Sequence, residues 1–111
     1  MNNDFTITRT NDSDCVRYEA FGRITTAATL ELEKALNQAV EDAMPRGGHE
    51  RRSIFINMNK VTLLTSGGIR VLLKTYKQCE NRGGKFRIER PSEAVSSVLG
   101  LAALHHMLSR N

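Results

Sequence analysis

Apolar and polar residues alternate along two short stretches near the start of the chain. Residues 5–8 and 15–21 both show the two-residue period of half-buried strands, and residues 11–14 (NDSD) between them favour a turn. We therefore expect an antiparallel hairpin. Residues 22–25, which are Gly22, Arg23, Ile24 and Thr25, end the second strand and lead into a helix.

The next stretch changes to the 3.6-residue period of an amphipathic helix. Its apolar positions are Ala28, Leu32, Ala35, Leu36, Ala39, Val40 and Ala43. The pattern predicts a helix over residues 26–44, with Thr25 or Thr26 as its N-cap and Pro45 as its end. Residues 45–52 then form a polar surface connection.

The second half of the chain repeats the strand–helix order. Residues 53–58 are almost continuously apolar, interrupted by Asn57, which suggests a central strand covered on both faces and ending near Asn57. We then expect a helix over residues 66–82 that Gly83 and Gly84 end, followed by a strand over residues 85–89. Pro91 or Ser92 begins another helix, and residues 101–108 form a last short helix or strand.

This order predicts an α/β (α+β-like) fold in a single domain spanning residues 1–111. We expect a mixed sheet of four to five strands with about four helices packed against it. Loops beyond the carboxyl ends of such strands usually carry the function. Asn57, Ser66 and residues 22–25 belong to that edge.

Residues 61–73 (VTLLTSGGIRVLL) hold the strongest local signal. An apolar run stops at Thr65, and a helical pattern starts directly afterwards, so Ser66 is the expected N-cap. Gly67 and Gly68 have no side chains to cover its hydroxyl. Free N–H groups and the helix dipole favour a phosphoryl group at this place. The alternative is that Ser66 merely caps the helix.

Residues 54–68 (IFINMNKVTLLTSGG), together with the helix, Gly-Gly and strand after them, resemble the STAS domain family. The resemblance is greatest to the bacterial anti-sigma factor antagonists and extends from Gly22 to about Leu108. The family pattern is a strand ending in Asp or Asn (here Asn57), then a D-S-[S/T]-G turn and an amphipathic helix. Its phosphorylated serine falls on Ser66, while Thr65 replaces the aspartate and Gly67 the second hydroxyl residue.

The resemblance implies a non-enzymatic interaction switch. The unphosphorylated domain would bind an anti-sigma factor that is also a serine kinase, a GHKL-type ATPase, and so release a sigma factor. A metal-dependent serine phosphatase would reverse the phosphorylation, and ATP and metal would belong to these partners, so the domain itself needs no cofactor. The expected interface comprises Gly22, Arg23, Ile24, Thr25, Asn57, Thr65, Ser66, Gly67, Gly68, Arg70 and Lys74.

Composition narrows the remaining alternatives. The chain has 40% hydrophobic and 25% charged residues and no run long enough to span a membrane, which suggests a cytoplasmic protein. Its formal charge of +4 fits an acidic protein partner better than a nucleic acid, since no aromatic residues interleave with the basic ones. A STAS subunit that binds the ATPase of an ATP-driven transporter is the main alternative function.

Enzymatic motifs are not evident in the sequence. Leu64 occupies the first glycine position of a G-x-S-x-G elbow, so Ser66 does not fit an esterase nucleophile. Cys15 and Cys79 lack metal or redox spacing and are expected to be buried, idle thiols. The three histidines, His49, His105 and His106, are interpreted as structural or surface residues.

Overall fold

A computed structural model describes residues 4–48, 51–101 and 104–107. Four strands form one sheet in the order β1-β2-β3-β4: β1 (Phe5–Asn11), β2 (Cys15–Ile24), β3 (Ser53–Leu64) and β4 (Phe86–Glu89). β1 pairs antiparallel with β2, and the other two pairings are parallel. The predicted mixed sheet and its N-terminal hairpin are confirmed. Residues 22–24, expected in a loop, instead complete β2.

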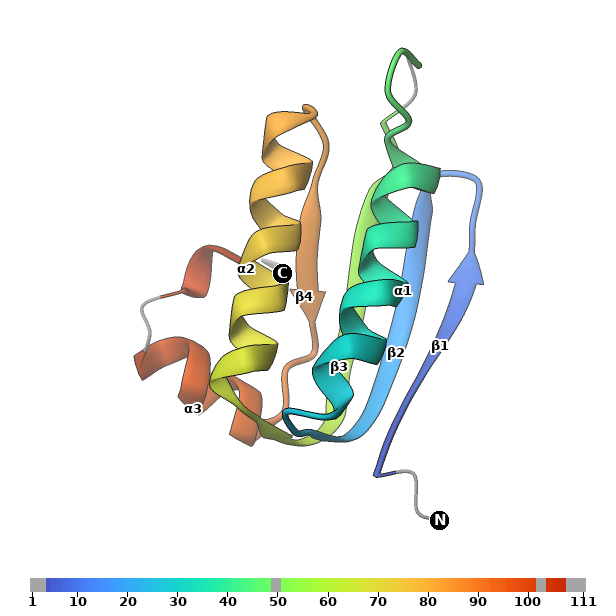
Figure 1. Cartoon of the computed structure of the whole chain (residues 1–111). Coiled ribbons are helices and arrows are strands. Elements are labelled where there is room, and N and C mark those ends of the chain that lie inside the picture. The colour runs from blue at the N-terminus through green and yellow to red at the C-terminus, as the bar shows by residue number, and fades with distance from the viewer. Residues whose placement is uncertain (1–3, 49–50, 102–103, 108–111) are drawn as a thin grey trace.

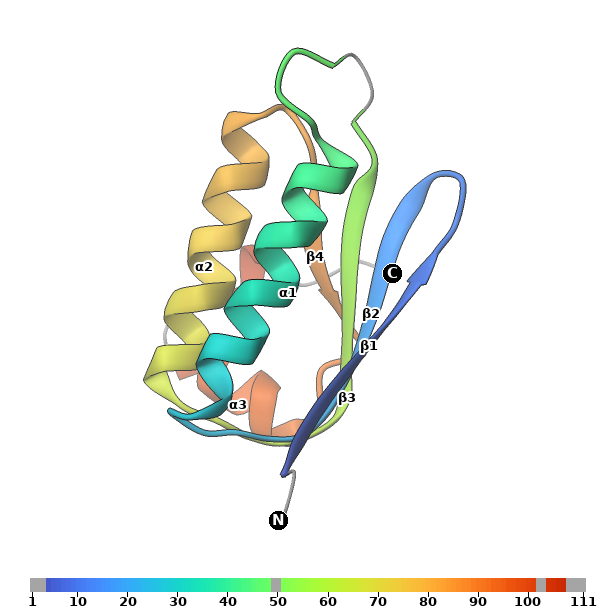
Figure 2. The ribbon, with the colours of Figure 1, turned by 45° about the vertical axis from the view of Figure 1, so that its right-hand side comes forward.

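The described residues contain three α-helices and one short 3-10 helix. These are α1 (Ala28–Ala43), α2 (Ser66–Asn81), α3 (Glu93–Leu101) and η1 (His105–Met107). α1 and α2 lie side by side on one face of the sheet (Figures 1 and 2). Both begin at the edge where β2 and β3 end (Figure 1). The α/β class is confirmed, although the described residues contain three α-helices where about four helices were expected. His49 and residue 108, which were named above, lie outside the described residues.

Sequence signals act as predicted at the end of α2 and at the start of α3, but not at the start of α1. Ala27 occupies the N-cap position of α1 without a side-chain cap, so the expectation that Thr25 or Thr26 is the N-cap is wrong. The N–H groups of Gly83 and Gly84 donate to the carbonyls of Glu80 (3.1 Å) and Cys79 (2.8 Å), which is the Schellman arrangement, with Gly83 at φ +76°. Ser92 Oγ accepts from the N–H of Val95 at 3.2 Å and so caps α3. These local patterns were sufficient to place both helix boundaries.

β3 differs from its prediction in two ways. It continues to Leu64, because its last residues pair with the end of β2, so Asn57 lies in the middle of the strand. There the Asn57 side chain accepts from the N–H of Asn59 (2.9 Å), beside a register shift between β2 and β3. The expectation that Asn57 ends the strand near Ser66 is therefore wrong.

The sheet is also not covered on both faces along β3. Ile54, Ile56 and Met58 are fully buried, whereas Phe55 and Asn57 between them are only half-buried. The guanidinium of Arg17 lies 4.9 Å from the centroid of the Phe55 ring. An aromatic ring shielded by a cation explains why the apolar run resembled a strand buried on both sides.

One ion pair connects α1 with α2, and a second connects α1 with Arg82, the C-cap residue of α2. Lys74 Nζ lies 2.8 Å from Glu33 Oε2, and Arg82 Nη2 lies 3.2 Å from Glu41 Oε2. Arg82 also donates to the Met44 carbonyl at 3.0 Å. Because Lys74 forms an ion pair with Glu33, it is not an unpaired cation on the surface of α2.

The junction between β3 and α2 is fixed by Thr65. Its hydroxyl and its N–H both donate to the Ile24 carbonyl, at 2.8 Å and 3.2 Å. The last residue of β2 therefore holds the residue that precedes α2. We call these two bonds the Thr65–Ile24 tether.

Replacing Thr65 by Val should destabilise the fold by about 1 kcal/mol, the usual net contribution of one hydrogen bond. The loss stays modest because the Ile24 carbonyl still accepts the Thr65 N–H. Thr65→Ser keeps the hydroxyl and should stay within about 0.5 kcal/mol of wild type. Urea unfolding measures both variants, and equal losses would show that the hydroxyl does not contribute.

Gly22 should tolerate no side chain. Its φ is +97°, and a Cβ there would overlap the Asp4 carbonyl oxygen. The backbone strain and this overlap together should lower the free energy of unfolding of the Gly22→Ala protein by about 2–4 kcal/mol. Gly47→Ala is the matched control, because Gly47 has φ +78° with nothing within 4 Å of an added Cβ. Gly47→Ala should lose only about 1 kcal/mol of unfolding free energy. Equal losses by the two variants in denaturant unfolding would refute the close contact between Gly22 and the Asp4 carbonyl.

Candidate functional site

Ser66 is the first residue of α2, and Thr65 occupies the N-cap position with extended backbone angles (φ −88°, ψ 169°). The prediction that Ser66 caps the helix is therefore wrong. Thr65 gives no side-chain cap either, and its hydroxyl instead donates to the Ile24 carbonyl. The start of α2 is consequently left without any capping side chain.

The surroundings of Ser66 favour negative charge. Ser66 is exposed, and its hydroxyl has no hydrogen bond to any described residue. The N–H groups of Ser66, Gly67 and Gly68 precede the first α-helical bond, from Ile69 N to the Thr65 carbonyl (3.0 Å), and the first turn contains no acidic residue. An anion attached to Ser66 would meet these donors and the positive end of the dipole.

The two glycines after Ser66 serve the packing of α2 more than access to the hydroxyl. Gly68 is buried, and a Cβ there would lie 2.7 Å from Leu64 Cδ1 and 2.8 Å from Ile24 Cγ2. A Cβ on Gly67 would lie 3.1 Å from Thr29 Cγ2 on α1. Gly68 therefore lets the helix sit close against the sheet, and Gly67 is half-buried beside α1.

The end of β2 and the residues that follow it lie next to this helix start, as expected from the topology. Arg23 is exposed and pairs with Asp4 at 3.6 Å, and Thr25 is half-buried, with its Oγ1 3.4 Å from the N–H of Ala28. Ile24 is fully buried, so its carbonyl contributes to the site through the Thr65–Ile24 tether while its side chain belongs to the core.

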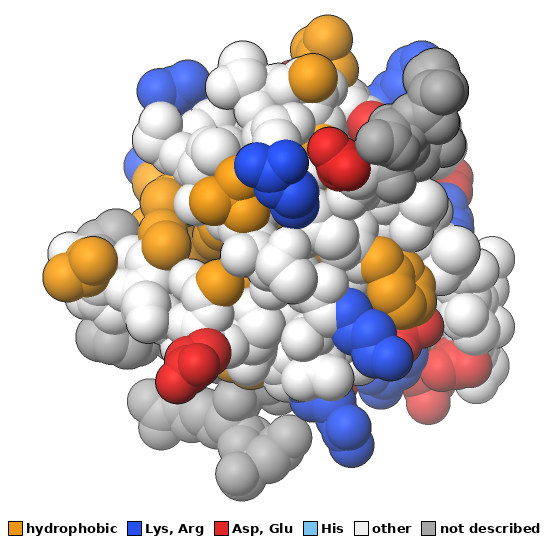
Figure 3. All heavy atoms as spheres, turned by 90° about the horizontal axis from the view of Figure 1, so that it is seen from below, with side chains coloured by type: hydrophobic (Ala, Val, Ile, Leu, Met, Phe, Trp, Pro, Cys, Tyr) orange, Lys and Arg blue, Asp and Glu red, His pale blue; other side chains and the backbone are white. Residues whose placement is uncertain are grey.

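Small or uncharged polar residues make up much of the face that contains these segments. Figure 3 views the molecule from the end where β3 runs into α2, and backbone and uncharged polar atoms fill the middle between separate hydrophobic and basic side chains. Of the predicted site residues, the structure brings together residues 22–25 and 65–68. It leaves Asn57 back along β3.

Arg70 and Lys74 follow along the outer side of α2. Both are exposed, and Lys74 is bound to Glu33. Arg70 makes no hydrogen bond or ion pair with any residue in the described ranges. Arg70 is thus an unpaired cation one turn after Ser66.

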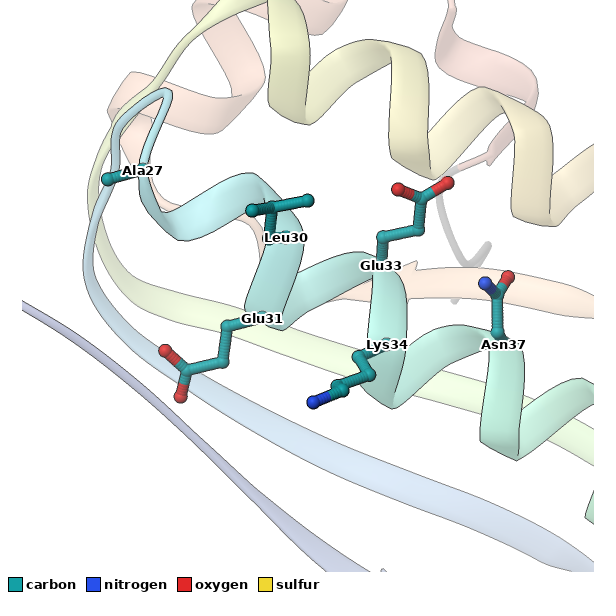
Figure 4. A pocket seen from close by; sticks show the side chains of 6 residues that line it. All are labelled: Ala27, Leu30, Glu31, Glu33, Lys34 and Asn37. Atoms are coloured by element: carbon teal, nitrogen blue, oxygen red, sulfur yellow. The ribbon is translucent and has the colours of Figure 1, made fainter.

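Sequence reasoning missed an exposed leucine on α1. Leu30 is 73% exposed and lines a surface hollow together with Ala27, Glu31, Glu33, Lys34 and Asn37 (Figure 4). A signal for it was present, since Leu30 falls outside the apolar stripe that Ala28, Leu32 and Leu36 form. Leu30 directly follows Thr29, whose methyl group faces Gly67.

Other reactive groups lie away from this face or are buried. Both cysteines are free and buried, and burial raises the pKa of the Cys79 thiol to about 12. Within the residues that the structure describes, no three His, Cys, Asp or Glu side chains gather as a metal site would require, and no helix has the length and apolar character to cross a membrane.

Comparisons with solved structures find proteins of the same fold. Unphosphorylated SpoIIAA, an anti-sigma factor antagonist, is similar with a TM-score of 0.76 at 16% identity, over 94% of this chain and 86% of that one. An anti-sigma factor antagonist from Mycobacterium paratuberculosis gives 0.77 at 20% identity, over 94% and 82%. The murine anion transporter Slc26a9 gives 0.66 at 13% identity, over 87% of this chain and 15% of the transporter.

At these identities the structural matches show a shared fold. Comparison with curated proteins gave no match. The family model of the STAS domain, however, matches residues 6–110, which is nearly the whole chain. The chain therefore belongs to the STAS domain family.

Proposed function

We propose that this STAS domain is an anti-sigma factor antagonist, a non-enzymatic cytoplasmic binding protein that is switched by phosphorylation of Ser66. One observation carries the proposal: Ser66 is exposed, makes no hydrogen bond within the described residues and stands at an uncapped helix start. The resemblance in sequence puts the family's phosphorylated serine at this same position.

The unphosphorylated domain binds its partner through the surface around Ser66. Thr65 and Gly67 flank this serine in the chain, and Arg70 extends the surface along α2. Arg23 and Thr25 flank Ile24, whose carbonyl accepts the hydrogen bonds of Thr65. A phosphoryl group adds close to two negative charges at the middle of the contact. The dipole of α2 tolerates this charge, so the fold survives while the interface is lost.

The partners supply the chemistry that the switch requires. The anti-sigma factor is a serine kinase of the GHKL ATPase type, and it phosphorylates Ser66 from ATP. A metal-dependent serine phosphatase removes the phosphoryl group and restores binding. The sigma factor is released while the unphosphorylated domain occupies the anti-sigma factor.

A second candidate function is a STAS subunit that binds the ATPase of an ATP-driven transporter. The murine anion transporter Slc26a9 contains the same fold, so the fold by itself is compatible with a role beside a transporter. Nucleic-acid binding ranks third, because basic side chains such as Arg82 and Arg87 already face Glu41 and Glu80. Identification of the bound protein or RNA after affinity purification distinguishes the three.

Substitutions at Ser66 should separate binding from folding. Ser66→Ala should change stability by less than about 0.5 kcal/mol, because the hydroxyl bonds to nothing in the described chain. It should bind the anti-sigma factor but accept no phosphate. Ser66→Asp should keep a native circular-dichroism spectrum and bind on the order of 100-fold more weakly, or roughly 3 kcal/mol.

Calorimetry with purified anti-sigma factor measures the binding of these variants, and mass spectrometry after incubation with ATP locates the phosphate. Thr65 is the internal control, because its hydroxyl is engaged with Ile24. Phosphate on Thr65, or on neither residue, would contradict the assignment. Equal binding by wild type and Ser66→Asp would favour the transporter alternative.

Arg70 should accelerate association with an acidic partner. Arg70→Glu should slow association several-fold at low salt and flatten its salt dependence, while dissociation changes little. Lys77→Glu, two turns further along α2, carries the same charge change and should have the smaller effect. Surface plasmon resonance at two salt concentrations compares them, and equal slowing would indicate a general field of the protein instead of a contact at Arg70.

A further inference from the structure

Arg70 lies one helical turn after Ser66 on the same side of α2. Residues four apart on a helix are neighbours, and helical Cα–Cβ bonds tilt toward the N-terminus, so the side chain of Arg70 leaves the backbone on the side of Ser66. An anion that precedes a cation by four residues is also the more favourable order. A phosphoryl group on Ser66 would therefore come within reach of the Arg70 guanidinium.

Two other cations in this region already have partners. Arg23 pairs with Asp4 and Lys74 pairs with Glu33. Figure 4 shows Glu33 directed toward α2, whereas Glu31 and Lys34 extend to the other side of α1. Arg70 itself lines a shallow surface hollow with Leu73, Lys74, Lys77, Gln78 and Asn81, which offers it no carboxylate. The guanidinium is thus available within the described part of the chain.

We propose that Arg70 is the intramolecular counterion of phosphorylated Ser66. This inference rests on the proposed function insofar as it requires phosphate on Ser66. A guanidinium can donate two parallel hydrogen bonds to phosphate oxygens. Phosphorylation then acts twice on the interface: it adds negative charge at Ser66, and it withdraws the cation that the unphosphorylated domain offers to its partner.

The test uses the full chain with phosphoserine introduced at position 66 during synthesis, so it needs no kinase. Phosphorus NMR follows the second ionisation of the phosphate, whose ordinary pKa is about 6. A neighbouring cation stabilises the dianion and lowers this pKa, so Arg70→Gln should raise it by about 0.3 pH unit. Arg70→Lys should retain most of the lowering, and the matched control Lys77→Gln should leave the pKa unchanged.

Two outcomes would overturn the proposal. One is an equal pKa in the Arg70→Gln and Lys77→Gln proteins. The other is a rise in Arg23→Gln with no rise in Arg70→Gln, which would place the counterion at the end of β2. Because the phosphate is installed chemically, failure of any anti-sigma kinase to modify Ser66 would count against the proposed function and leave this titration intact.

Discussion

The Ile24 carbonyl organises the part of the molecule around Ser66. It ends β2, accepts both donors of Thr65, and is followed directly by Thr25, which leads into α1. One acceptor therefore relates the end of β2 and the starts of both helices. Parallel pairing of Ile24 with Leu64 already brings residues 22–25 and 65–68 to the same edge of the sheet. The bonds from Thr65 then fix the residue that precedes α2, so both segments form one surface.

Close packing beneath this surface determines which side chain reaches solvent. Gly68 is pressed between Leu64 and Ile24, and Gly67 lies against Thr29, so the first turn of α2 has little freedom to rotate or lift. Ser66 is the one residue of the Ser66–Gly68 turn that bears a side chain, and it is exposed. The burial of the glycines and the exposure of the serine are thus consequences of the same contact between helix and sheet.

Sequence patterns correctly predicted several structural features that depend only on residues close together in the chain. The hairpin, the helix end at Gly83 and the cap at Ser92 all follow from local chemistry. Thr65 and Ser66 are equally competent caps by type, and the choice between them depends on a carbonyl 41 residues away in the chain. The position of Asn57 and the pairing of Lys74 likewise depend on strand register and helix packing, which no local pattern contains.

The structure also constrains how a modification at Ser66 could act. Its hydroxyl takes part in no described hydrogen bond, so a phosphoryl group would break no contact that holds the fold together. The added charge would instead meet unpaired N–H groups and, one turn on, an unpaired guanidinium. Meanwhile α1 and α2 share one buried core that does not include Ser66. Such a modification would therefore change the affinity of this surface for a binding partner and would leave the fold of the domain unchanged.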